Sequence, residues 1–414
     1  MNSSVLEDIF STAKSQFDLT QSSDLQSLLA LSTHLLEQQD LDLEQLQAAG
    51  RRQDAPLEFQ LALKLVISRR WMLQNQKAAK IAVIFAMWGE HHRLLPKSAN
   101  NPHGEDSLRT KLEQLQWICA DTPVQWQLFA VDDGCPHGSA DLAEQIASAH
   151  PLSAQVQVLR LQDALPASSG ALKKLASADD SRKAGAIIHG CEIALQDDVD
   201  AVIYTDADNS VHLGQIGLLL QPFLDDGVKV VLGDRKHPDA VLVKQEARWG
   251  QGIVLLRHMQ RMIGHAIYSR GIFDTQAAFK LFSADVLRGI LQDPTVFDFS
   301  FDSDWILGAL AQGVEPRQVP FAFIDSAAES ASIAQGPMTT WEALLQGLVA
   351  AVRRHGVPHN EEMAAVLDQQ VKSSTDLDRV INTLPPALAN APAERLGDPS
   401  LMSPADVGTW FQSH

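Results

Sequence analysis

The stretch Ala201-Val202-Ile203-Tyr204-Thr205-Asp206-Ala207-Asp208-Asn209-Ser210 decides the fold class of this chain. A short, uninterrupted run without charge, such as the first half of this stretch, is typical of a strand that is buried on both faces of a parallel sheet. Residues two apart in a strand, or in its terminal turn, point the same way. The stretch therefore predicts a strand that delivers the carboxylates of Asp206 and Asp208 to one spot at the edge of a sheet.

Similar runs recur from residue 80 onward and alternate with helical patterns. The expected strands are Ile81–Trp88, Gln127–Val131, Val156–Leu161, Ala201–Thr205, Val228–Gly233 and Val319–Ile324. The expected helices between them are Ser107–Ala120, Ala140–Ala149, Arg182–Leu195 and Leu213–Leu224. This alternation predicts an α/β fold with a mostly parallel sheet covered on both faces. Polar residues just after a strand are the best candidates for ligand contacts, because such sheets bind ligands at the carboxyl ends of their strands.

Both ends of the chain have a helical sequence pattern that differs from the alternating pattern of the middle. Leucines recur at helical spacing within residues 1–78, and helical patterns return over Met338–His355 and Glu361–Leu384. We expect an N-terminal helical domain at 1–78, an α/β domain at 79–330 and a C-terminal helical segment at 331–414. The helical ends suit packing, self-association or a protein partner.

Composition restricts the classes of function. The net charge is −18 over 414 residues, and such an acidic surface repels nucleic acid and anionic lipid. Three cysteines argue against a disulfide framework and for a reducing compartment. The longest apolar run, Ile81–Trp88, is far shorter than the ~20 residues that span a bilayer, and no signal peptide is evident. We expect a cytoplasmic protein without a transmembrane segment, with peripheral membrane association as the alternative.

An Asp-x-Asp pair alone is weak evidence for a metal site. The chain has five of these pairs, at Asp40/Asp42, Asp198/Asp200, Asp206/Asp208, Asp302/Asp304 and Asp376/Asp378. Only Asp206 and Asp208 follow directly on a buried-looking strand. Two carboxylates that face one spot repel each other unless a cation lies between them, and Mg²⁺ or Mn²⁺ suits oxygen ligands and can bridge to a diphosphate. A solvated turn is the alternative.

Two further motifs could contact a ligand at the same sheet edge. Asp132 and Asp133 end a strand, where a carboxylate can accept hydrogen bonds from a base or a ribose, or form an Asx-turn instead. Arg182 and Lys183 open a helix, and a basic helix N-terminus is a natural anion site. Ordinary capping by Ser181 is the alternative.

The acceptor side is less well defined by the residues. Asp302 and Asp304 begin a helix, where acids are favoured by the dipole even without a catalytic role. The segment from Lys244 to Arg270 is locally basic, and Arg257 and Arg261 share one helical face. That face is either a solvated surface or a site for an acceptor phosphate.

The motifs, in chain order, resemble those of family 2 glycosyltransferases. The ordered set is Val131–Gly134, Lys183 with Gly185, Asp206–Asp208, Gly233–Arg235, Asp274–Lys280 and Phe301–Asp304. It is similar to the dolichyl-phosphate glucosyltransferase-like branch, without membrane helices, and covers roughly residues 80–330. The resemblance implies a GT-A-type nucleotide-sugar-binding α/β domain that inverts the anomeric carbon of the transferred sugar.

The resemblance also implies roles for individual residues. Asp133, with Asp132 beside it, corresponds to the acid that binds the base or ribose, Lys183 to a diphosphate contact, and Asp206 and Asp208 to the metal pair. The other implied substrate contacts are Glu90, Arg235, Asp274, Gln276, Lys280 and, for an acceptor phosphate, Arg257.

For a hydroxyl acceptor, the candidate general base is Asp304, which stands where the family commonly has a Glu, and Asp302 is the next candidate. A phosphate acceptor needs no strong base, and the basic segment Arg248–Arg270 would position it. The expected partners are a UDP- or GDP-linked sugar and an acceptor that is a glycan, a small molecule or a polyprenyl phosphate.

The sequence also bears on three other classes of function. An inactive nucleotide-sugar-binding scaffold would keep the same fold. A haloacid dehalogenase-type phosphatase would use Asp206 and Asp208 with an acidic motif at Asp234–Asp239, but only about two dozen residues separate these motifs. A sugar nucleotidyltransferase would need a Gly-rich loop after the first strand, which Met87–Arg93 does not supply.

Overall fold

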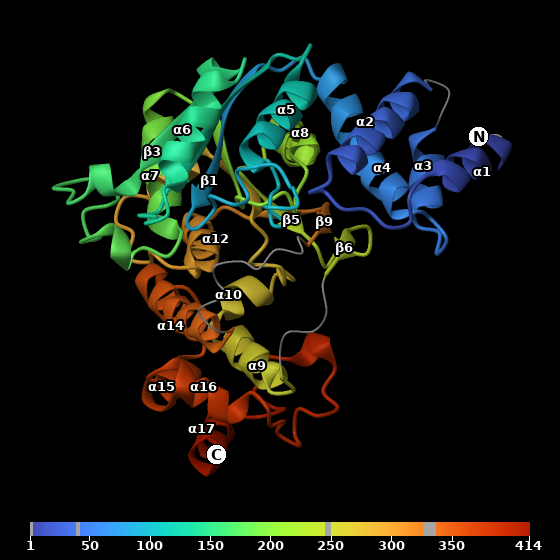
Figure 1. The fold of residues 1–414 in the computed structure, drawn as a ribbon. Helices are drawn as coiled ribbons and strands as arrows, with labels where there is room; N and C mark the ends of the chain where they lie inside the picture. The colour runs from blue at the N-terminus through green and yellow to red at the C-terminus, as the bar shows by residue number, and fades with distance from the viewer. Residues whose placement is uncertain (1–2, 39–41, 245–249, 326–336) are drawn as a thin grey trace.

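A seven-stranded sheet forms the centre of the protein in a computed structural model that describes residues 3–38, 42–244, 250–325 and 337–414 (Figure 1). The strand order is β3-β2-β1-β4-β7-β5-β8. The strands are β1 (Ala79–Met87), β2 (Val124–Asp132), β3 (Val156–Arg160), β4 (Ala201–Thr205), β5 (Val230–Asp234), β7 (Phe279–Ser283) and β8 (Arg317–Pro320). All pairs are parallel except those of β7, which runs opposite to both neighbours. The expected mostly parallel sheet is thus present.

Two strands were not expected from the sequence. One is β7, in the interior of the sheet, and the other is β6 (Val241–Val243), which pairs in parallel with β9 (Ala322–Ile324) in a separate two-stranded sheet. The strand expected over Val319–Ile324 is divided between β8 and β9, on either side of Phe321. A single apolar run therefore serves two sheets.

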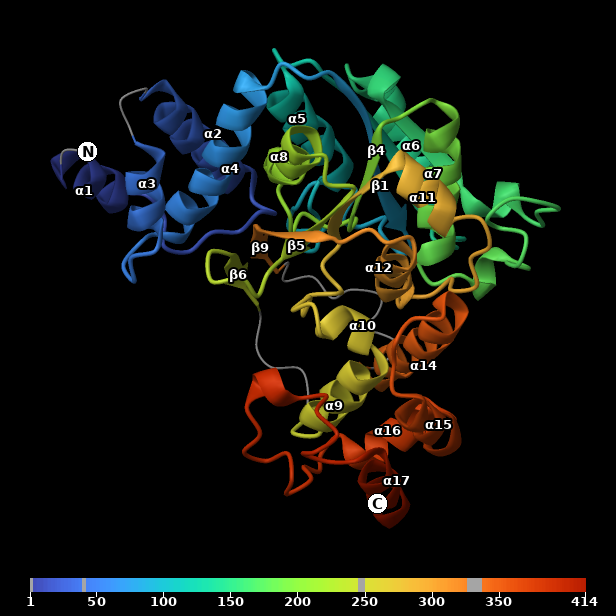
Figure 2. The same cartoon turned by 180° about the vertical axis from the view of Figure 1, so that it is seen from behind.

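Helices cover both faces of the central sheet. Alternate residues of β1 show why, since Ile81, Val83 and Phe85 belong to one core and Ala82 and Ile84 to the other. One face carries α5 (Ser107–Cys119), α6 (Ser139–Ala149) and α8 (Ile216–Asp226), and the other carries α7 (Ala184–Gln196), α11 (Ala284–Ile290) and α12 (Phe301–Ala311) (Figure 2).

The N-terminal residues form four helices, α1 (Ser3–Thr12), α2 (Ser22–Glu37), α3 (Leu43–Gly50) and α4 (Leu57–Gln74). They share a core with Val241, Ala322 and Ile324 of the small sheet, and α4 also packs against α8. In both views this helical unit lies at one side of the sheet, beside β6 and β9 (Figures 1 and 2). The small sheet therefore joins the N-terminal helices to the α/β domain.

The C-terminal helices gather below the sheet with α9 (Ile253–Ile263) and α10 (His265–Tyr268) (Figure 2). They are α14 (Pro337–His355), α15 (Glu361–Gln370), α16 (Ser374–Val380) and α17 (Pro404–Ser413). The helix expected over Glu361–Leu384 is broken between α15 and α16. The expected domain boundary at residue 330 falls outside the described residues, as do Asp40 and Arg248. None of the helices in the described ranges is long and apolar enough to cross a bilayer.

Candidate active site

A cleft of about 440 Å³ lies at the carboxyl ends of β1, β2 and β4. It is lined by seven of the residues that the sequence singled out, namely Glu90, Asp133, Lys183, Asp206, Asp208, Gln276 and Asp302. Side chains that the sequence did not single out also line it, among them Trp88, Arg93, Phe323, Asp325 and Thr340. The parallel strands thus bring together residues that are far apart in the chain.

Asp206 and Asp208 lie just past the end of β4, and both line the cleft. Burial, together with the negative charges of Asp206 and Glu105, raises the pKa of Asp208 to about 7. The backbone N–H of Ser210 donates to Asp208 Oδ1 over 3.0 Å. Two carboxylates that oppose each other's ionisation in one wall form an environment that a cation would stabilise.

Lys183 lies opposite this pair, immediately before α7. Its ammonium forms an ion pair with the carboxylate of Asp206. Burial lowers the pKa of Lys183, but the charges of Asp206 and Asp302 outweigh that effect and raise it. The backbone of Lys183 has φ +78°, in the left-handed region that L-residues rarely adopt. The fold therefore holds this side chain in the cleft at a conformational cost.

Asp133 and Asp132 have different surroundings although they are adjacent. Asp133 lines the cleft and accepts hydrogen bonds from Ser181 Oγ at 2.5 Å and from the backbone N–H of Lys183 at 2.6 Å. Burial raises its pKa to about 6. Asp132 instead accepts from the backbone N–H groups of Gly134 and Cys135, in the Asx-turn that was the alternative interpretation. Of the two, Asp133 is the one positioned to contact a ligand in the cleft.

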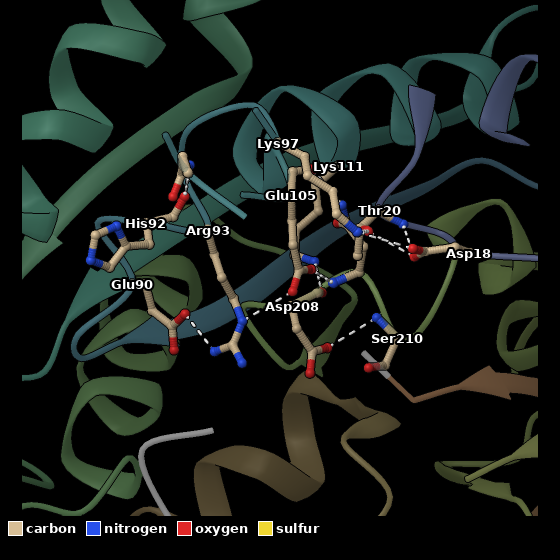
Figure 3. A network of polar contacts seen from close by, with 12 residues as sticks. Asp18, Thr20, Glu90, His92, Arg93, Lys97, Glu105, Lys111, Asp208 and Ser210 are labelled. Carbon is tan, nitrogen blue, oxygen red and sulfur yellow. Dashed lines mark hydrogen bonds and ion pairs between the residues drawn. The ribbon is translucent and has the colours of Figure 1, made fainter. Parts of the chain in front are cut away.

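A polar network behind Asp208 was not expected from the sequence (Figure 3). Arg93 donates to Glu90 Oε2 over 2.8 Å and to Glu105 Oε1 over 3.0 Å. Glu105 also accepts from the backbone N–H of Asn209 over 2.7 Å, and Lys111, which is fully buried, donates to the backbone carbonyl of Asp208. The loop after β1 thus fixes the turn that carries Asp208.

Asp302 lies at the floor of the cleft in a buried cluster. Its carboxylate accepts from Lys280 Nζ at 2.5 Å and from the hydroxyl of Tyr204. Lys280 lies on β7 and is fully buried. It contacts Asp302 from the side of the sheet and does not line the cleft. Both donors bind the same oxygen, Oδ1, so the carboxylate is held in one orientation.

The candidate base Asp304 does not line the cleft. It is fully buried, and its oxygens accept from Arg354 at 2.9 Å and contact His355 Nε2 at 2.9 Å. Two residues along a helix are about 200° apart around its axis, so Asp302 and Asp304 face opposite sides of α12. Asp304 therefore joins α12 to α14, and the expectation that it faces the reacting sugar is corrected.

Asp274 and Arg235 bind each other and lie behind the cleft wall. Arg235 donates to both oxygens of Asp274, over 2.8 and 2.6 Å, and its guanidinium lies 5.0 Å from the ring of Phe323. Phe323 lines the cleft, so this pair supports the wall. Arg235 and Asp274 were expected to contact substrate directly, but neither lines the cleft. Gln276, which was also expected to contact substrate, does line it.

Arg257 is exposed on α9 and is not among the cleft-lining residues. It belongs to a basic group with Lys236, Lys244 and Arg261. Burial, then the charges of Arg257 and Arg261, lower the pKa of Lys236 to about 8 despite the opposing charge of Asp274. The basic segment foreseen in the sequence therefore lies near Arg235, at the far side of the cleft wall.

Comparisons with known proteins place the chain in a class. Residues 105–291 match the family model described as "Glycosyl transferase family 2". Among solved structures, glucosyl-3-phosphoglycerate synthase from Mycobacterium tuberculosis, in complex with Mn²⁺, UDP and glucosyl-3-phosphoglycerate, is 14% identical with a TM-score of 0.45, covering 71% of this chain and 85% of that one. Mannosyl-3-phosphoglycerate synthase from Rubrobacter xylanophilus is 14% identical with a TM-score of 0.45, covering 70% and 78%.

The match covers less than half of the chain, and within it the protein carries a family 2 glycosyltransferase domain, on a mixed α/β architecture with helical flanks, as the resemblance implied. The structure does not favour a phosphatase, because Asp234 and Asp239 do not line the cleft together with Asp206 and Asp208. Asp239 instead pairs with Arg51 of the N-terminal helical unit.

Proposed function

We propose that the protein transfers a sugar from a nucleoside diphosphate sugar, UDP- or GDP-linked, to an acceptor, with Mg²⁺ or Mn²⁺ held by Asp206 and Asp208. The observation that carries the proposal is the juxtaposition of this acidic pair with Lys183 and Asp133 in one cleft. An acidic pair suits a divalent cation, and a lysine at a helix start suits a diphosphate. A buried carboxylate suits the N–H of a base or the hydroxyls of a ribose.

The residues fit a metal that binds together with the diphosphate. The described residues contain no group of three or more His, Cys, Asp and Glu arranged to hold a metal, so diphosphate oxygens and water would complete the coordination of a cation at Asp206 and Asp208. When bound, such a cation would neutralise charge on the leaving diphosphate.

Lys183 has a specific task in this proposal. Its ammonium forms an ion pair with Asp206. If a cation balanced the negative charge of Asp206, the ammonium could contact a diphosphate oxygen and would offset the charge that develops on the leaving group as the sugar–phosphate bond breaks.

The acceptor is proposed to carry an anionic group. Lys236, Lys244, Arg257 and Arg261 form a basic group beside Arg235, and the chain is otherwise acidic. Phosphate and carboxylate are the groups that such side chains recognise. A polyprenyl phosphate and a small phosphorylated or carboxylated acceptor both meet this description.

Inversion at the anomeric carbon stays a prediction. A hydroxyl acceptor would need a base opposite the leaving group, and of the two candidates only Asp302 lines the cleft. Lys280 and Tyr204 both donate to Asp302 Oδ1, so this oxygen is already hydrogen-bonded. A phosphate acceptor, already anionic, would need no base. The anomeric configuration of the product, read from proton NMR coupling constants, distinguishes inversion from retention.

The proposal is tested by binding and hydrolysis of UDP- and GDP-sugars with Mn²⁺ or Mg²⁺, measured by calorimetry and by nucleotide release. We expect one nucleotide sugar to bind only with metal present, and Asp208→Asn to abolish that dependence. Metal-dependent binding without transfer to any anionic acceptor would favour the inactive-scaffold alternative. Absence of metal-dependent binding for every nucleotide sugar would overturn the donor site.

A further inference from the structure

A second cavity, of about 580 Å³, lies between the N-terminal helices and the α/β domain. Its walls come from α3 and α4 on one side, and from α8, β8 and the segment between β5 and β6 on the other. It shares no lining residue with the cleft. The matched family 2 domain begins only at residue 105, so the N-terminal wall of this cavity lies outside the family's domain.

Lys64 is the unusual residue of this cavity. It lies on α4, lines the cavity and is only 8% exposed. Among the described residues, the one hydrogen-bond acceptor near its ammonium is the carbonyl oxygen of Pro320, at 3.5 Å. A buried ammonium with one long contact is poorly compensated.

The other cations that line the cavity differ from Lys64, because each has a carboxylate partner. Arg51 pairs with Asp239 over 2.7 Å, Arg52 with Asp54 over 2.5 Å, and Arg317 with Asp226. Lys64 forms no ion pair within the described ranges. Burial lowers the pKa of Lys64 to about 8 against the opposing charge of Asp239, so the group remains mainly protonated at pH 7. Asp225, Asp226 and Asp239 also line the cavity, but the ammonium of Lys64 is not in direct contact with any of these carboxylates.

We propose that this cavity binds a small phosphorylated molecule, with Lys64 contacting the phosphate. Arg51 and Arg317 lie at the rim with side chains 59% and 48% exposed, so both can reorient toward a second phosphate oxygen. Gln47 and Gln221 also line the cavity and can bond hydroxyl groups. The volume exceeds what a bare phosphate fills and lies within the ~300–1,000 Å³ of small-molecule sites.

The position of the cavity gives it a direct connection to the cleft. Val241 lines the cavity and pairs with Ala322 in the small sheet. The next residue of that strand, Phe323, lines the cleft. A ligand at Lys64 thus lies beside a short strand whose middle residue, Phe323, lines the cleft.

The test is calorimetric titration of the full chain with inorganic phosphate and with glucose 6-phosphate, at constant ionic strength and without nucleotide. The variant is Lys64→Met, which keeps the length of the side chain and removes the buried charge. Its control is Lys229→Met, at a half-exposed lysine that lines neither the cavity nor the cleft. We expect the wild type and Lys229→Met to bind glucose 6-phosphate more tightly than inorganic phosphate, and Lys64→Met to bind both about tenfold more weakly or worse.

Unchanged binding by Lys64→Met would overturn the proposal. Loss of binding in a Lys236→Met variant, with Lys64→Met unchanged, would place the anion at the basic group of the cleft wall instead. No heat from the wild type at millimolar probe would overturn it too. A second measurement needs no variant. Reductive methylation of the wild type, read peptide by peptide, should show that glucose 6-phosphate protects Lys64 but not the more exposed Lys97, and equal labelling of Lys64 with and without the probe would contradict the assignment.

Discussion

The ammonium of Lys183 is ion-paired with the carboxylate of Asp206, so the residue proposed to bind the diphosphate already neutralises half of the acidic pair proposed to bind the metal. This ion pair offsets the repulsion between the carboxylates of Asp206 and Asp208. Under the proposed function, metal binding and the contact of Lys183 with the donor diphosphate would depend on each other, because both the metal and Lys183 interact with the carboxylate of Asp206.

Replacing Asp208 with asparagine should remove metal-dependent donor binding. The substitution keeps the shape of the side chain and deletes one anionic ligand. We expect nucleotide-sugar affinity in Mn²⁺ to fall by more than about 10- to 100-fold, the range for outer-shell partners of a metal. Calorimetry with and without a chelator measures it. The matched control is Asp198→Asn, in an exposed Asp-x-Asp pair, which should bind as the wild type does.

The backbone of Lys183 allows stability to be separated from function. Both Lys183→Ala and Lys183→Gly remove the ammonium, but only glycine adopts φ +78° without strain. We expect the glycine variant to be more stable than the alanine variant by about 1 kcal/mol, measured by denaturant unfolding. Both variants should lose donor binding equally. An alanine variant as stable as the glycine variant would show that the conformation carries no strain.

Donor binding should depend on pH through Asp133. Its pKa in the folded protein, about 6, lies above the ordinary value of 3.8, so the carboxyl group gains a proton as the pH falls through 6. A protonated carboxyl loses acceptor capacity, and nucleotide-sugar affinity should therefore decrease between pH 7 and pH 5. Asp133→Asn should bind more weakly at pH 7 but with a flatter profile. An unchanged profile in this variant would assign the titration to another group.

Asp304 and Asp302 should differ in what their loss affects. Asp304→Asn leaves Arg354 without its buried carboxylate, which costs up to about 3–5 kcal/mol of stability. Its transfer rate per folded molecule should change little, because the residue does not line the cleft. Asp302→Asn should reduce the rate. Thermal unfolding and initial rates measure the two effects, and a rate lost in Asp304→Asn without loss of stability would restore it as the base.

The parallel strands were predictable because each is a continuous apolar run, and Asp206, Asp208 and Asp133 could be found because they follow such runs. The β7 strand was not, because Lys280 interrupts its apolar pattern. The burial of Lys280 depends on contacts with Asp302 and the carbonyl of Ala277 that the sequence pattern does not reveal. The pairing of Arg235 with Asp274 likewise depends on contacts between distant segments, which periodicity does not reveal.

Asp304 was selected for a different reason, because it stands where the family commonly has a Glu. Asp302 and Asp304 were expected to begin a helix, and in a helix a spacing of two places side chains on opposite sides, so only Asp302 lines the cleft. The contacts among Arg93, Glu105 and Lys111 could not be predicted from the sequence. Arg93 and Glu105 lie in a loop and Lys111 lies on a helix, and neither segment contains a recognisable motif.

The reversed direction of β7 bears on where the chain can vary in length. Each parallel strand opens onto the cleft at its carboxyl end, so the loop that follows it is constrained by the ligand. The amino end of β7 lies at the cleft. Its carboxyl end, at Ser283, leads into α11 at the opposite edge of the sheet. Among related chains, insertions after β7 should therefore be tolerated, whereas the segment that precedes it should keep a constant length.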